Sequence, residues 1–234
     1  MPHRSIRQFT PAPVSAATLT LLEATAQATA SSQFLQQFTL IRVADAAKRA
    51  AIAALTHCDF VAGPGVLYVF VVDQARNQRL LAAGVADRLR DWNAFLAGSF
   101  DATLAAQHVV DTAEALGLGT CYLGSILNDP QQMIDLLHLP RYTFPLLGLM
   151  VGHPATIPAG KPRLPQAAVV ATDQYPAPVS LTAYDNTLRD YYEHRPEHPR
   201  STDFTQLVNA YIKTDPHHRG EIGRILRQQG FRLD

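Results

Sequence analysis

The hydrophobic positions of this chain fall into four short runs that predict β-strands. They cover Phe38–Val43, residues 67–73, Gly119–Leu123 and residues 144–151. The run at 67–73 carries β-branched and aromatic side chains at successive positions, which is typical of a strand buried on both faces. We therefore expect that strand in the middle of a sheet.

Between these runs, apolar residues recur at spacings of three and four, which predicts helices. The predicted helices cover 15–29, 44–55, 79–96, 101–116, a stretch that opens at Asp129-Pro130, and then 181–194, 203–213 and 218–229. The helix at 101–116 has one almost wholly apolar side and is expected to be the central core helix; that side comprises Leu104, Ala105, His108, Val109, Ala113 and Leu116. Strands that alternate with helices and end in a helical tail indicate a layered α+β or α/β fold.

Composition narrows the class of protein. The chain has 234 residues, of which 47% are apolar and 17% charged, and 20 basic residues balance 20 acidic ones. This composition excludes a disordered chain, and the zero net charge argues against nucleic-acid binding driven by overall charge. The longest apolar run has seven residues, far short of the roughly 20 that a membrane helix needs. Two cysteines without metal-ligand spacing favour a reducing compartment, so we expect a cytoplasmic protein.

Two basic segments could bind an anion. The N-terminal segment contains His3, Arg4, Ser5 and Arg7, and an extended chain would bring alternate members onto one face. Such a cluster can hold a phosphate through charge-assisted hydrogen bonds, although a solvated basic tail has the same sequence. Farther along, Lys161 and Arg163 stand two apart in a Pro-stiffened stretch, which predicts a second anion clamp or an exposed loop.

Two further segments contain small residues. The glycine-rich stretch 117–125 follows a predicted helix and precedes a predicted strand, which is the reverse of the context of a dinucleotide-binding loop. It is either a helix cap followed by a strand or a place where Gly124 lets the backbone approach a flat ligand. The polar stretch 29–34 either caps a helix or lines the rim of a cofactor site. The sequence contains no G-x-S-x-G, P-loop, H-E-x-x-H or C-x-x-C motif, so neither a protein nucleophile nor a bound metal is expected.

Taken together and in this order, several motifs resemble one family. They are H-R-S-I-R-x-F, the Ser-rich turn, A-L-G-L-G-x-x-Y-L-G, F-P-L-L-G-L-M-V-G-x-P and K-P-R-L-P. The set resembles the FMN-dependent nitroreductase family, and the C-terminal part resembles its oxygen-insensitive NADPH nitroreductase and flavin reductase P group. The resemblance implies an α+β fold with a central, mainly antiparallel sheet flanked by helices. It also implies a homodimer with FMN at the subunit interface, an FMN-binding core at 1–174 and a helical extension at 175–234.

The resemblance also implies roles for individual residues. Two motifs imply contacts with the phosphate and ribityl chain, namely His3, Arg4, Ser5, Arg7, Lys161 and Arg163. The Ser-rich turn, Ser31, Ser32 and Gln33, is implied to contact the flavin across the dimer. The stretch along the isoalloxazine ring is Tyr122, Leu123, Gly124 and Ser125, and the residue implied for the NADPH phosphate is Arg200.

Two positions depart from the family pattern. The stretch 57–60 around Cys58 is shortened where relatives often carry a Gln that contacts the flavin. Ser125 stands where Gly is common, which would narrow the pocket above the ring.

The implied activity is hydride transfer from NADPH, or from NADH, to FMN, followed by two-electron reduction of nitroaromatics, quinones or flavins. The flavin carries such chemistry while the protein supplies position and charge, so no catalytic side chain is expected. One alternative is a flavin-binding or flavin-carrying protein with little turnover. Another is an anion- or nucleic-acid-binding module, which the lack of interleaved aromatic and basic residues opposes.

Overall fold

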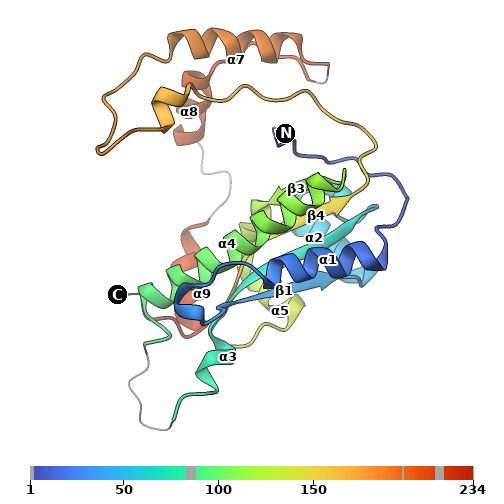
Figure 1. Ribbon diagram of the computed structural model, residues 1–234, viewed down its shortest axis with the longest axis vertical. Helices are drawn as coiled ribbons and strands as arrows, with labels where there is room; N and C mark the ends of the chain where they lie inside the picture. The colour runs from blue at the N-terminus through green and yellow to red at the C-terminus, as the bar shows by residue number, and fades with distance from the viewer. Residues whose placement is uncertain (1–2, 83–87, 197, 214–218, 234) are drawn as a thin grey trace. The chain divides into compact units, whose positions relative to one another are not determined.

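The computed structural model describes residues 3–82, 88–196, 198–213 and 219–233. The chain divides into two compact units, shown in Figure 1. The core unit comprises residues 5–157 and 217–234, and the appended unit comprises residues 1–4 and 158–216. The functional division predicted at residue 174 stays a prediction, because compactness alone does not define a functional domain.

The core unit is built on one antiparallel sheet whose strands lie in the order β1-β2-β4-β3. The strands are β1 (Phe38–Val43), β2 (Val66–Asp73), β3 (Gly119–Leu123) and β4 (Thr143–Gly152). All four predicted strands and the mainly antiparallel sheet are thus confirmed. β2 lies between β1 and β4 and is buried along almost its whole length, as its apolar run predicts.

Helices cover both faces of this sheet. On one face, Tyr68 and Phe70 of β2 pack in the same apolar cluster as helices α1 (Ala16–Gln27) and α4 (Trp92–Ala115). On the other face, Val69 and Val71 pack with α2 (Ala46–Thr56) and α5 (Pro130–Leu137). Alternate residues of one strand therefore serve opposite layers, which gives the predicted α+β arrangement.

The predicted bounds of the helices at 79–96 and 101–116 are wrong. A short helix, α3 (Ala75–Gln78), is followed by non-helical residues at 79–82, and residues 83–87 lie outside the described residues. α4 then runs unbroken from Trp92 to Ala115, capped at its start by Asp91, which accepts a hydrogen bond from Ala94 N at 2.9 Å. The hydroxyls within it bond back to the preceding turn, as Ser99 does to Phe95 O at 2.7 Å, so the polar stretch does not end the helix.

The predicted buried face of this helix is partly wrong. Its sheet-facing side consists mainly of alanines and valines, together with Gly98 and Asp101. Leu104 and Leu116 are about half exposed, at 50% and 49%, and His108 is exposed. Small side chains let the helix lie close to the sheet, so the larger apolar residues point outward.

The remaining elements are short helices and the helices that follow the sheet. The 3₁₀ helices are η1 (Ser32–Phe34), η2 (Asp59–Val61), η3 (Gly124–Asn128) and η4 (Arg219–Glu221), and the α-helices are α6 (Gln166–Val169), α7 (Thr182–His194), α8 (Phe204–Lys213) and α9 (Ile222–Gln228). The helix predicted at 218–229 thus starts as a 3₁₀ turn, and residue 218 lies outside the described residues. α9 belongs to the core unit, where Ile225, Leu226 and Phe231 pack against Phe144.

The appended unit has a small aromatic core of its own. Tyr184, Leu188 and Tyr192 of α7 are buried, and Phe204 at the start of α8 packs on them. Arg189 also donates to Asp203 Oδ2 at 2.8 Å, and Thr205 donates to Asp185 through its N–H at 3.1 Å and its hydroxyl at 2.9 Å. Ring packing, an ion pair and these hydrogen bonds therefore hold the two helices together.

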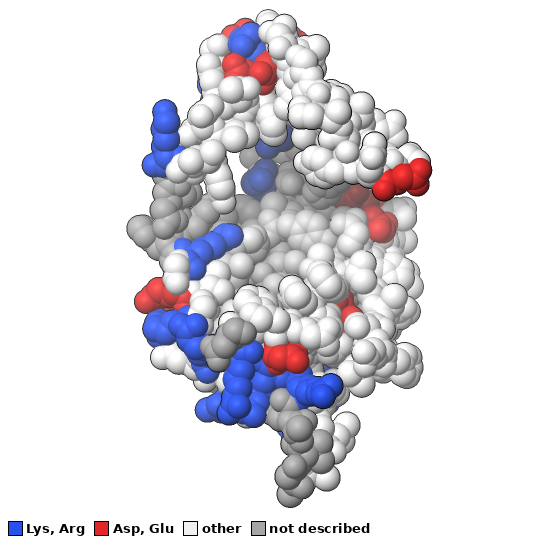
Figure 2. Space-filling view, turned by 90° about the vertical axis from the view of Figure 1, so that its left-hand side faces the viewer, with Lys and Arg blue, Asp and Glu red and all other residues white. Residues whose placement is uncertain are grey.

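The surface charge is uneven although the net charge is zero. On the face drawn in Figure 2, Lys and Arg side chains gather in the lower part, with few acidic groups among them. Within the described ranges, no helix combines the length and the hydropathy that crossing a bilayer requires.

Candidate functional site

The N-terminal arm lies along the outer edge of β3. Ser5 forms a parallel bridge with Thr120, and Ile6 N donates to Thr120 O at 2.8 Å. Ile6 is 3% exposed and packs on Gly119, where a Cβ would lie 2.6 Å from Ile6 Cγ1. Because side chains alternate in an extended chain, Ser5 and Arg7 share the other side of the arm, and Arg7 is exposed.

The backbone leaves the sheet at the end of β3. Leu123 is buried, and Gly124, which opens η3, is exposed. Tyr122 is half-buried, and its hydroxyl donates to Gln107 Oε1 at 3.2 Å. Burial raises the pKa of Tyr122, and the carboxylates of Asp111 and Glu114 raise it further. This end of β3 therefore presents exposed backbone at Gly124 beside a neutral phenol.

The segment around Cys58 reaches the same place. Cys58 Sγ lies 3.9 Å from Ser125 Oγ, so the two positions expected to depart from the family pattern are in contact. The loop that follows is held by Arg49, which donates to Val61 O at 2.8 Å and to Gly65 O at 2.9 Å. Burial lowers the pKa of Arg49.

Sequence reasoning missed a cation at this end of β3. Arg219 Nη2 donates to Gly124 O at 2.9 Å, and a Cβ built on Gly124 would meet that same nitrogen at 3.8 Å. A lone arginine 95 positions away from its partner carries no local signal, so only the fold brings them together.

The Ser-rich turn lies at the opposite edge of the sheet, before β1. Ser31 Oγ donates to Asp101 Oδ2 at 2.7 Å, and Ser32 N donates to Asp101 Oδ1 at 2.9 Å. Ser32 and Gln33 are exposed, and Gln33 has a left-handed backbone with φ 51°. Sequence reasoning also missed Asp101, which fixes this turn from α4.

The two edges are too far apart for one small ligand to contact both in a single chain. Across the sheet, Leu123 of β3 pairs with Gly148 of β4, Gly148 pairs with Val69 of β2, and Val69 pairs with Ile41 of β1. The edges are separated by three inter-strand spacings of about 4.8 Å, and Gln37 lies four residues farther along at about 3.4 Å each. The separation is therefore about 20 Å.

The appended unit gathers cations from both ends of the sequence. A Cβ on Gly160 would lie 3.8 Å from Arg4 Nε, so Arg4 lies beside the stretch that carries Lys161 and Arg163. All three cations are exposed, and His3 is half-exposed. This arrangement suits an anion such as a phosphate.

A second pair of arginines in this unit stacks on one ring. The guanidinium carbons of Arg195 and Arg200 lie 4.8 and 4.7 Å from the centroid of Tyr192. Arg200 N also donates to Tyr192 O at 3.0 Å. Both guanidiniums thus lie on the Tyr192 ring and form a positive group there, and Arg195 Nε also donates to His198 O at 2.7 Å.

Comparison with known proteins decides the family. The model of the nitroreductase family matches residues 1–153, and the model of that family's C-terminal domain matches residues 161–234. The chain belongs to the nitroreductase family. The fold predicted from the motifs, the nitroreductase-like fold, is therefore confirmed.

Relatives within the nitroreductase family match along nearly their whole length. The oxygen-insensitive NADPH nitroreductase of Salmonella typhimurium is 39% identical, over 98% of this chain and 95% of the relative. The solved structure of NfrA2 from B. megaterium has a TM-score of 0.91 at 34% identity, covering 100% of this chain and 96% of that one. The NADPH:FMN oxidoreductase of Vibrio harveyi, solved with NAD+, has a TM-score of 0.86 at 30% identity, covering 98% and 95%.

Proposed function

We propose that this nitroreductase-family chain is an FMN-dependent NAD(P)H oxidoreductase that reduces nitroaromatics, quinones or flavins. One observation carries the proposal, namely the full-length similarity to relatives named for NADPH-dependent nitro and FMN reduction. FMN would supply the chemistry by accepting a hydride from the nicotinamide and passing two electrons to the acceptor. This chain then has to bind and orient FMN and supply positive charge for its phosphate.

The side chains present fit FMN. Each unit by itself supplies cations that suit a phosphate. The core unit has exposed Arg7 with Ser5 near it in sequence, and the appended unit has exposed Arg4, Lys161 and Arg163 with His3 next to Arg4 in sequence. Among the described residues, only Arg219 comes within 4 Å of a Cβ built on Gly124, which leaves the backbone open to a flat ring at Gly124. Arg219 adds positive charge there, which favours the negative charge that builds up on reduction.

A homodimer follows from the separation of the two edges of the sheet. If Ser31, Ser32 and Gln33 contact flavin, the roughly 20 Å to the end of β3 requires that they contact the flavin bound by a partner subunit. α4 offers a surface for such a partner, because Leu96, Phe100 and Leu104 recur at a spacing of four and are 43%, 60% and 50% exposed. Exposed apolar rows of this kind are typical of protein interfaces.

The positive group on Tyr192 supports a preference for a phosphorylated nicotinamide. Arg195 and Arg200 stack on that ring, and a guanidinium suits a phosphate monoester. NADPH would then be used in preference to NADH. The two free thiols, Cys58 and Cys121, fit the proposed cytoplasmic location.

A visible absorption spectrum of the purified full chain, followed by anaerobic addition of NADPH, tests the function. We expect flavin bands that bleach on NADPH and return when an acceptor is added. In Arg7→Ala and Lys161→Ala, FMN retention should fall about tenfold, since each removes a charge-assisted contact. Arg224→Ala is the control, because that exposed arginine pairs with Glu221.

Each other outcome has a definite meaning. A chain that stays colourless after incubation with FMN contradicts the proposed function. Bands that bleach without turnover of any acceptor support the alternative of a flavin carrier. Full retention of FMN in both variants would show that the cation assignment is wrong.

A further inference from the structure

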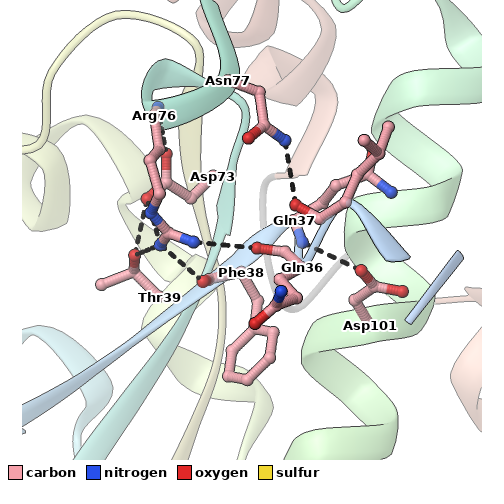
Figure 3. Close-up of polar contacts among 9 residues, drawn as sticks. Gln36, Gln37, Phe38, Thr39, Asp73, Arg76, Asn77 and Asp101 are labelled. Atoms are coloured by element: carbon pink, nitrogen blue, oxygen red, sulfur yellow. Dashed lines mark hydrogen bonds and ion pairs between the residues drawn. The ribbon is translucent and has the colours of Figure 1, made fainter. Parts of the chain in front are cut away.

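The turn at residues 31–37 has an unusual backbone. Gln33, Phe34 and Gln36 have φ values of 51°, 60° and 50°, in the left-handed region that non-glycine residues rarely adopt. Such a conformation persists only where the surroundings enforce it. The contacts that enforce it come from α4 on one side and from the end of β2 with α3 on the other (Figure 3).

Asp101 binds the N–H groups of the turn. Its side chain lies on α4, is 1% exposed and accepts three hydrogen bonds. Two come from the backbone, with Ser32 N at 2.9 Å from Oδ1 and Gln37 N at 2.9 Å from Oδ2. The third comes from Ser31 Oγ at 2.7 Å from Oδ2. One buried carboxylate thus joins the first and last residues of the turn.

Arg76 and Asn77 bind the carbonyl groups of the same stretch. Arg76 donates to Gln36 O and to Phe38 O, both at 3.0 Å, and Asn77 Nδ2 donates to Leu35 O at 3.0 Å. Arg76 is itself oriented by Asp73 Oδ2 at 3.2 Å. The donors of the turn therefore face a carboxylate while its acceptors face a guanidinium and an amide.

We propose that Asp101 is a positioning residue of the flavin site, with Arg76 as its counterpart. It holds Ser32 and Gln33 exposed in the one arrangement that contacts FMN bound by the partner subunit, so the binding surface is organised before FMN arrives. Preorganisation raises affinity because ordering does not have to accompany binding. This inference rests on the proposed function and adds a buried residue that touches neither cofactor nor substrate.

The decisive variant is Asp101→Asn. The amide keeps the shape, but its NH₂ must replace Oδ1 or Oδ2, and either choice sets it against a backbone N–H donor of the turn. Asp135→Asn is the matched control, since Asp135 is exposed on α5 and accepts from the Gln131 side chain at 3.0 Å. Ser31→Ala removes the bond from Ser31 Oγ to the carboxylate and the bond that Ser31 Oγ accepts from Gln36 N at 2.6 Å, and it leaves both backbone contacts of Asp101.

Two measurements on the full chain separate the steps of the argument. Amide hydrogen exchange without FMN should show Ser32 and Gln37 exchanging about tenfold faster in Asp101→Asn, and FMN titration should show a Kd about tenfold weaker. Ser31→Ala should fall between wild type and Asp101→Asn, and Asp135→Asn should match wild type. Saturating FMN should restore kcat in Asp101→Asn, because only the affinity is lowered.

Faster exchange with an unchanged FMN Kd would overturn the positioning role while the proposed function stands. Unchanged exchange would overturn the clamp itself. A wild-type chain that binds no FMN would defeat the proposed function, and this inference with it. If Asp101→Asn does not fold, Ser31→Ala and Arg76→Lys decide, and wild-type Kd in both would overturn the inference.

Discussion

The two edges of the sheet are satisfied in different ways. At β3, main chain continues the sheet, since Ile6 N donates to Thr120 O and a buried Ile6 fills the space above Gly119. At β1, a side chain satisfies the free backbone carbonyls, since Arg76 donates to Gln36 O and to Phe38 O. The β3 edge is therefore sensitive to volume and the β1 edge to charge. Each edge leads into one half of the proposed flavin site.

The largest expected effect comes from weakening the proposed dimer, because the β3 edge of one subunit then no longer meets the β1 edge of its partner. Leu104→Asp places a charge in the exposed apolar row of α4, which an interface would have to desolvate. We expect the dimer Kd to weaken about 100-fold or more, since several kcal/mol are lost, and FMN to be lost with it. Sedimentation velocity and flavin absorbance measure both.

Leu116→Asp is the control for that variant. Leu116 is as exposed as Leu104, at 49% against 50%, and it is the C-cap of the same helix, outside the row. A Leu104→Asp protein that remained a dimer with full FMN would show that α4 is not the interface.

A smaller effect is expected from Gly119→Ala at the β3 edge. The new methyl would lie 2.6 Å from Ile6 Cγ1 and 2.8 Å from Ile6 Cβ, so the N-terminal arm must shift. We expect a loss of about 1–3 kcal/mol in the free energy of unfolding, measured by urea denaturation, together with weaker FMN binding. Gly223→Ala on α9 should raise the free energy of unfolding by about 0.5–1 kcal/mol, since a Cβ there meets only Arg227 Nη1, at 3.8 Å, among the described residues. Equal stability of the two variants would refute a tightly packed β3 edge.

The smallest effect concerns the two thiols near the end of β3. FMN should slow alkylation of half-buried Cys58, because Cys58 touches Ser125 in the proposed ring-binding stretch. Burial raises the pKa of Cys121, with Arg7 partly opposing it, so Cys121 should react slowly and speed up as pH rises. Because the folded state favours the neutral Cys121 thiol, its contribution to the free energy of unfolding is fully present below the unfolded pKa and is lost as pH rises through the folded pKa.

Mass spectrometry after timed labelling measures the alkylation rate of both thiols. Equal Cys58 rates with and without FMN would place that thiol away from the flavin.

The strands could be predicted because burial on both faces leaves an unbroken apolar run, as in β2. The outward face of α4 could not, because an apolar row facing a core and one facing a partner have the same period. Leu104 was therefore expected inside and is half exposed. Alanines and valines of α4 face the sheet instead. The distance between the helix and the sheet, rather than the hydrophobicity of the residue, decides which side chains fit there.

Local motifs allow a site to be predicted from sequence, whereas contacts assembled by the fold do not. The N-terminal arm with Ser5 and Arg7 and the Ser-rich turn are assigned to the site by the family resemblance of their motifs, and these assignments stay predictions. Asp101 did leave a signal, since it is the only charged residue between Asp91 and Asp111, and a buried charge requires partners. Arg219 left none, because its partner Gly124 lies 95 positions away along the chain.

Mixed dimers test the central claim, that opposite edges of two subunits build one flavin site. Arg7→Ala damages the β3 edge and Asp101→Asn damages the β1 edge, so each homodimer has two damaged sites. A heterodimer of the two has one site with both defects and one with neither. After co-refolding at equal amounts, about a quarter of all sites should bind FMN with wild-type Kd, since half the dimers are mixed. Binding no better than that of the parent variants would contradict the claim and would place both edges in the site of a single chain.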